Sequence, residues 1–162
     1  MSIVDSLPGA SAMEGLLNHR PQLSAQYRVF YESFWRDGLV PRRVLALTRL
    51  RIAYIHSCVA ELQIVDAQAS VSANEHDQLS RGHIAGFSES EQSALKLAEQ
   101  MPHSVHQITD DQVQAAAQHF GHPGCVALLT ALAFFDVNCR LKLVYEIPAL
   151  ESETSPECES QL

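Results

Sequence analysis

Hydrophobic residues recur along this chain every three or four positions, which is the period of a helix with one buried face. In the segment between Pro21 and Gly38 the apolar face consists of Leu23, Tyr27, Phe30 and Phe34. A proline near the start and a glycine just past the end favour helix termini at those places. We therefore predict a helix over 21–37.

A second helix is predicted to begin at Pro41 and to run on as one long helix through the stretch Arg49 to Ser70. Its apolar residues occupy more than one side, so this helix should be central and buried. Spacings of three and four place on one helix face Arg51, Tyr54, Cys58, Glu61 and Val65.

The remaining pattern is also helical. A short polar helix is predicted over 72–82, and capping boxes at Ser88–Glu91 and Thr109–Gln112 open the next two helices. The second of these should end at Gly121, before a last long helix over 123–145. No alternation of period two is present, so the predicted fold class is all-α.

Composition points to a packed, soluble protein. The chain has 162 residues, of which 46% are hydrophobic, and a formal charge of −8 that disfavours nucleic acid and anionic membranes as partners. The apolar stretch "CVALLTALAFFDV" is too short and too interrupted to span a bilayer, and the N-terminus shows no signal peptide. We expect a cytoplasmic location.

One domain is the simplest division of the chain. We predict an N-terminal segment over 1–20, a helical domain over 21–148 and a tail over 149–162. The tail sequence "ESETSPECESQL" carries four glutamates and no basic residue, so it is expected to be disordered.

The cysteines and histidines do not predict a metal centre or a cofactor site. The cysteines are never spaced as C-x-x-C and are expected to be free thiols: Cys58, Cys125, Cys139 and Cys158. Two histidine pairs have a spacing of three, but they lie at a loop and at a helix end without carboxylate or cysteine neighbours: His103 with His106, and His119 with His122. No phosphate-binding glycine loop is present.

Cys58 and Glu61 are the candidate reactive pair. In the middle of a helix, Cys58 would gain little from the helix dipole, and the Glu61 carboxylate one turn away would raise the pKa of its thiol. Within the same helix only Arg51 could oppose this effect. Cys58 could equally be a small buried residue of the core, but a carboxylate in an apolar stretch needs a partner or a role.

Four blocks of sequence, in this order, resemble the carboxymuconolactone decarboxylase and alkylhydroperoxidase D-like (AhpD-like) superfamily. They are "GLVPRRVLALTRLRIAYIHSC", "GFSESEQSALKLAEQM", "ITDDQVQAAAQHF" and "LLTALAFFDVNCRLKLVYEIP". The resemblance implies an all-α core of about six to seven helices with the cysteine helix at its heart. It also implies a homo-oligomer, commonly a trimer or hexamer.

The catalytic pattern of the superfamily is only partly present. The peroxidase branch has a relay glutamate, then C-x-H-C and a further histidine, and these positions correspond here to Ala46, Cys58, Ala60, Glu61 and Val65. A second branch, with C-x-Y-E-W-x-x-H, matches at both Cys58 and Glu61 but lacks its histidine here as well.

The resemblance implies a thiol-dependent peroxidase with Cys58 as peroxidatic thiol and Glu61 as its acid–base partner, acting on a hydroperoxide or a lactone-like small molecule. Because C-x-x-C is missing, a resolving thiol would have to come from Cys139, Cys125 or a small-molecule thiol. The alternatives are a catalytically inactive oligomeric scaffold or small-molecule-binding protein, and a lyase or decarboxylase using Glu61 with His56 or His83.

Overall fold

The computed structural model of the protein describes residues 12–148, which form seven α-helices and one short 3-10 helix with no strand. Their bounds are α1 Ala12–Leu17, α2 Pro21–Arg36, α3 Arg42–Ile55, α4 Val59–Leu62, α5 Ala73–Ser80, α6 Glu89–Gln100, η1 Val105–Gln107 and α7 Asp110–Val144. The all-α prediction is confirmed for this part of the chain. The predicted tail, and the first eleven residues of the predicted N-terminal segment, lie outside it.

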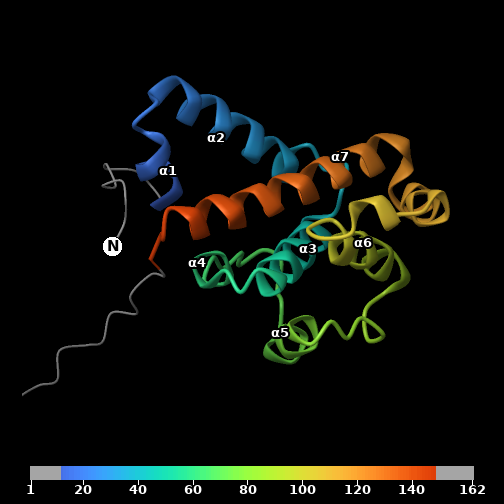
Figure 1. The fold of residues 1–162 in the computed structure, drawn as a ribbon. Coiled ribbons are helices and arrows are strands. Elements are labelled where there is room, and N and C mark those ends of the chain that lie inside the picture. Colours follow the sequence, from blue (N-terminus) through green and yellow to red (C-terminus); the bar gives the residue numbers. More distant parts are fainter. Residues whose placement is uncertain (1–11, 149–162) are drawn as a thin grey trace, which may run out of the picture.

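Helix α7 crosses the middle of the molecule, with α2 along one side and α3 and α6 on the other (Figure 1). Its two segments meet at Gly121, which has a φ of 70° and a ψ of 169°. A left-handed φ is readily adopted by glycine, and Pro123 begins the second segment. The predicted helix end at Gly121 is therefore present as a bend.

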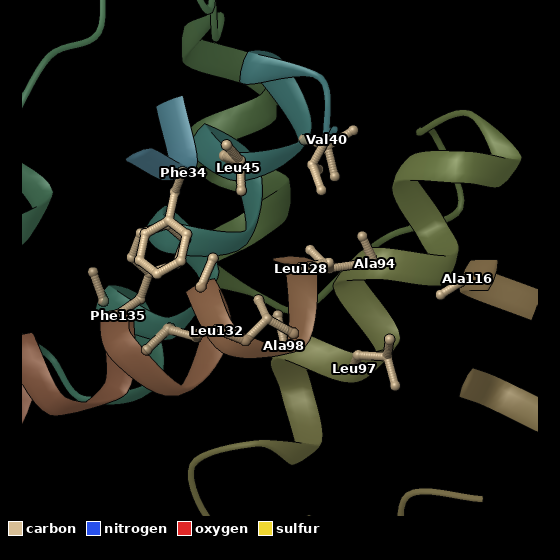
Figure 2. Packing of buried hydrophobic residues seen from close by; sticks show 14 of the residues in the cluster. Phe34, Val40, Leu45, Ala94, Leu97, Ala98, Ala116, Leu128, Leu132 and Phe135 are labelled. Atoms are coloured by element: carbon tan, nitrogen blue, oxygen red, sulfur yellow. The ribbon is translucent and has the colours of Figure 1, made fainter. Parts of the chain in front are cut away.

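The main core forms where α3, α6 and α7 meet. Figure 2 shows Leu128, Leu132 and Phe135 of α7 packed toward Phe34, Leu45 and the alanines of α6. Ten successive residues of α3, Val44 to Ala53, are buried, which confirms that this helix is central. By length and apolar composition α7 would also suit a membrane span, but 44% of its most apolar window is buried inside the protein.

The predicted long helix through Arg49 to Ser70 is wrong, because α3 ends at Ile55. Ser57 has a left-handed φ of 53°, and its N–H donates to the Tyr54 carbonyl while the N–H of Cys58 donates to Ala53. These two bonds form a Schellman motif, which usually contains glycine at the left-handed position. Because serine stands there instead, no residue at this position signals the end of the helix in the sequence.

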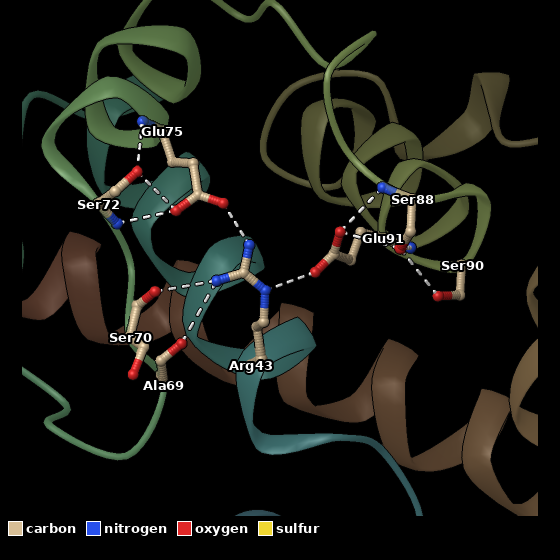
Figure 3. Close-up of polar contacts among 8 residues, drawn as sticks. All are labelled: Arg43, Ala69, Ser70, Ser72, Glu75, Ser88, Ser90 and Glu91. Carbon is tan, nitrogen blue, oxygen red and sulfur yellow. Dashed lines mark hydrogen bonds and ion pairs between the residues drawn. The ribbon is translucent and has the colours of Figure 1, made fainter.

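Arg43 joins the first turns of two helices on the other side of α3. Its guanidinium is bonded to Glu75 and, at 2.7 Å, to Glu91, and it also donates to the Ser70 carbonyl at 3.0 Å (Figure 3). Both glutamates belong to capping boxes, with Ser72 at α5 and Ser88 at α6. The box at Ser88 was predicted, and so was the one at Thr109 that opens α7.

Candidate active site at Cys58

Cys58 lies at the start of a helix and not in the middle of one. It is the N-cap residue of α4, a single turn of four residues, and its side chain is buried between the exposed Ser57 and Val59. The sulfur makes no regular cap hydrogen bond, but the backbone N–H of Glu61 still helps to lower the pKa of the thiol.

Glu61 is fully buried and bound by two cations from other helices. Its Oε1 accepts a hydrogen bond of 3.0 Å from Arg49 of α3, and its Oε2 is paired with the Lys142 ammonium of α7. Arg49 is only 2% exposed and also donates to the carbonyls of Glu61 and Ile64, at 2.8 and 2.7 Å. The carboxylate therefore has the partners that its apolar surroundings require.

This buried cluster carries one positive charge in excess. Arg49 and Lys142 supply two formal positive charges, and Glu61 supplies one negative charge. The nearby phenol of Tyr31 stays neutral, because burial and then the charge of Glu61 raise its pKa to about 12. A thiolate at Cys58 would bring the cluster to neutrality, and buried charges persist only when they are compensated.

The pKa of the Cys58 thiol is lowered to about 7. A hydrogen bond from the Cys139 side chain is the main cause, and it outweighs the loss of solvation on burial, which raises the pKa. The Glu61 amide and the Lys142 charge lower the pKa further, whereas the Glu61 carboxylate raises it. A free thiol with such a pKa is about half ionised at neutral pH, and the thiolate is the nucleophilic form.

Cys139 is the neighbour of Cys58 across the core. The sulfur of Cys58 lies 4.0 Å from the Cys139 carbonyl oxygen, and both residues belong to the main core cluster. The pKa of Cys139 is strongly raised, first by the hydrogen bond to Cys58 and then by burial. One thiol of the pair is therefore acidic, and the other remains protonated.

The other residues considered from the sequence lie elsewhere. Arg51 pairs with Glu99 at 2.8 Å, so it does not act on Cys58 as its helical spacing suggested. The ring of His56 is bonded to Asp136 at 2.6 Å, and His83 is exposed in the loop after α5. Within residues 12–148 no three histidine, cysteine or acidic side chains are arranged to hold a metal ion.

Two hollows adjoin Arg49. A cavity of about 60 Å³ is lined by Ala46 and Val65, the positions that hold a glutamate and a histidine in the peroxidase branch. An open cleft of about 480 Å³ lies between α2 and residues 64–68, and its lining includes Tyr31, Trp35 and Arg49. Arg49 thus separates the cleft from Glu61, to which it is bonded.

Cys58 and Glu61 could be predicted as site residues from the sequence, but Arg49 and Lys142 could not. Arg49 was placed on the central helix without a role, and Lys142 stands in an apolar segment, "RLKLVYEIP". A lysine within such a segment is the one local signal, because an ammonium that is buried needs a carboxylate partner. That the partner is Glu61, 81 residues away, follows only from the fold.

No protein-family model and no curated protein matches the sequence. Among solved structures, the protein is similar to a protein of unknown function from Agrobacterium tumefaciens that is provisionally described as an antioxidant defence protein, AhpD. The match has a TM-score of 0.73 and covers 90% of this chain and 98% of that chain, at 13% sequence identity. Together with the all-helical architecture, it shows that this chain has an AhpD-like fold.

Proposed function

We propose that this protein is a thiol-dependent peroxidase in which Cys58 is the peroxidatic residue. The observation that carries the proposal is the cluster of Arg49, Glu61 and Lys142, whose excess positive charge a thiolate at Cys58 would balance. The relay glutamate and the histidines of the peroxidase branch are absent, so this buried cluster supplies the activation that they would have provided.

The reaction begins with attack of the Cys58 thiolate on the terminal oxygen of a hydroperoxide. The S–O bond forms as the O–O bond breaks, which gives a sulfenic acid on Cys58 and an alkoxide. The alkoxide takes a proton from the Lys142 ammonium and leaves as the alcohol. Glu61, bonded to that ammonium, is the acid–base partner that keeps Lys142 in place and supports its return to the charged form.

The substrate approaches through the thin layer that covers Cys58. Val59 is 54% exposed and Ser57 is exposed, so both chain neighbours of Cys58 face solvent at the start of α4. A small hydroperoxide reaches the sulfur when this turn moves, since a helix of one turn has little stability of its own. The cleft beside Arg49 accommodates the organic part of a larger substrate.

The proposal extends to the assembly and its location. The AhpD-like fold is a soluble fold, and we place the protein in the cytoplasm, where thiols stay reduced. We also propose a homo-oligomer, a trimer or a hexamer. Its support is a row of exposed valines on one face of α7, named here the α7 valine face: Val126, Val137 and Val144.

Replacement of Cys58 tests the proposed activity. The purified Cys58→Ser variant should lose consumption of hydrogen peroxide and of an alkyl hydroperoxide, measured with dithiothreitol as reductant. Cys125→Ser is the matched control, because Cys125 is also a buried cysteine but burial raises the pKa of its thiol. Unchanged peroxide consumption by Cys58→Ser would show that Cys58 is not the peroxidatic residue.

A non-catalytic small-molecule-binding protein is the second candidate. It is favoured by the 480 Å³ cleft, whose lining includes the aromatic rings of Tyr31 and Trp35 and suits an aromatic ligand, and by the complete ion pairing of Glu61. In that case Cys58→Ser would leave ligand binding intact, and peroxide consumption by the wild-type protein would not exceed that of dithiothreitol alone.

A further inference from the structure

Turnover of the proposed peroxidase requires a thiol that resolves oxidised Cys58, and no cysteine follows at C-x-x-C spacing. Three cysteines lie within the described residues, and all three are buried: Cys58, Cys125 and Cys139. The positions of Cys125 and Cys139 in the fold therefore decide which of them can reach Cys58.

Cys139 is placed to reach Cys58. The two residues are 81 positions apart in the sequence, but the Cys58 thiol donates a hydrogen bond to the Cys139 carbonyl oxygen at 4.0 Å, and both residues pack in the same core cluster. Both side chains are almost completely enclosed, with exposed fractions of 1% and 0%. Two cysteines held this close together in the core react with each other more readily than with a thiol from solvent.

Cys125 is not placed to do so. It lies fourteen residues before Cys139 on the same helix, which is about 21 Å along the helix axis at 1.5 Å per residue. Its thiol donates instead to the Val113 carbonyl, at 3.6 Å. A disulfide requires Cα atoms within about 7 Å of each other, so Cys125 cannot pair with Cys58 in this fold.

We propose that Cys58 and Cys139 form a reversible disulfide and that Cys139 is the resolving residue of the site. This assignment rests on the proposed function. The partner that the peroxidase branch supplies at C-x-x-C spacing is here supplied by α7, and Glu61 occupies the vacated position. The roles are not interchangeable: Cys58 is at the start of the single-turn α4, whereas Cys139 is held within the long α7.

The chemistry of the resolving step balances. The Cys139 sulfur attacks the sulfur of the Cys58 sulfenic acid, an S–S bond forms as the S–O bond breaks, and the Cys139 proton leaves with the hydroxyl as water. An external dithiol then reduces the Cys58–Cys139 disulfide by exchange and becomes oxidised itself, which restores both thiols. The two residues already lie together in the core, so the first step needs little rearrangement.

The test is to map disulfides in the full-length chain after oxidation. The protein is treated with hydrogen peroxide or, separately, with diamide, which oxidises thiols to disulfides without a sulfenic acid. Free thiols are then blocked with N-ethylmaleimide under denaturing conditions, and the unreduced digest is analysed by mass spectrometry. The variants are Cys139→Ala and the matched control Cys125→Ser.

Peroxide should join Cys58 to Cys139 and remove two free thiols per chain in the wild type and in Cys125→Ser. Cys139→Ala should show no such link, and its Cys58 should be labelled by dimedone as a sulfenic acid. A Cys139 that stays free in the wild type while Cys58 is oxidised would overturn the assignment, and so would a link from Cys58 to Cys125 or Cys158.

The two reagents separate the two proposals. If diamide forms the Cys58–Cys139 link but peroxide leaves Cys58 reduced, the pair is correct and the peroxidase proposal fails. If peroxide produces a sulfenic acid at Cys58 and neither reagent produces the link, the peroxidatic role survives and the role of Cys139 is wrong. Both results come from the wild-type protein, so they do not depend on the folding of a variant.

Discussion

At the scale of single residues, the candidate site depends on the charge of Lys142, which lies far from Cys58 and Glu61 in the sequence. Lys142 is 7% exposed and Glu61 is 1% exposed, and their contact joins the last turns of α7 to α4. Because Arg49 can neutralise Glu61 alone, Lys142 is the cation in excess. It is therefore the residue whose charge a thiolate at Cys58 balances, and it lowers the pKa of that thiol.

Removing this charge should make Cys58 a weaker acid. In Lys142→Met we expect the pKa of Cys58 to rise from about 7 by about one unit, the usual size of the effect of one nearby opposite charge. The measurement is the pH dependence of iodoacetamide alkylation at the Cys58 peptide, whose rate rises with pH and levels off above the pKa. Lys96→Met, at an exposed position of α6, is the control, and an identical midpoint in both variants would contradict the role of Lys142.

At the scale of elements, Arg43 links the N-termini of α5 and α6 to α3. Burial alone raises the pKa of both carboxyls, but hydrogen bonds outweigh this effect and lower it. Glu75 accepts these bonds from Ser72 and Arg43, and Glu91 accepts them from Ser88 and Arg43. A carboxyl with a lowered pKa stabilises the fold above its unfolded pKa of about 4.3, and this contribution is lost as the pH falls through the folded pKa.

Arg43→Leu should therefore reduce stability more at pH 7 than in acid. We expect a loss of about 1–2 kcal/mol in the free energy of unfolding, since the lost bonds are charge-assisted but partly screened by solvent. Urea unfolding at pH 7 and near pH 3 measures this loss, and it should shrink at the lower pH. Arg36→Leu, which breaks an exposed pair with Glu32, should change stability by less than about 0.5 kcal/mol. Equal effects of the two substitutions would show that Arg43 adds no more than a surface ion pair.

Helix starts could be predicted from the sequence better than the break before Cys58. The boxes at Ser88 and Thr109 are local signals, in which a side chain bonds to a backbone N–H three residues on. The break after Ile55 depends on Ser57 in a left-handed conformation, which serine adopts only when the surrounding fold stabilises it. For the same reason the sequence placed Cys58 in mid-helix, without the amide and the second thiol that lower its pKa.

At the scale of the whole molecule, the chain has an AhpD-like fold, while the positions of the peroxidase motif other than Cys58 hold different residues. The resemblance in the sequence was sufficient to predict the fold, because it rests on the order of helices and on their apolar faces. The site could be predicted only in part, because Arg49, Lys142 and Cys139 become its neighbours through packing between helices. A sequence motif identifies positions along one segment, whereas the groups that surround Cys58 and Glu61 here lie on other helices.

Assembly is the remaining property of the whole molecule, and the α7 valine face gives it a test. Val126, Val137 and Val144 are separated by eleven and seven residues, so they share one side of the helix, with exposed fractions of 66%, 43% and 66%.

We expect light scattering coupled to gel filtration to give three or six times the chain mass of 17.9 kDa. Val137→Glu should shift the protein to the monomer, because a glutamate placed in an apolar interface loses solvation without gaining a partner. Val105→Glu, at an exposed valine on η1, should leave the mass unchanged, and a wild-type protein that is monomeric at micromolar concentration would contradict the proposed oligomer.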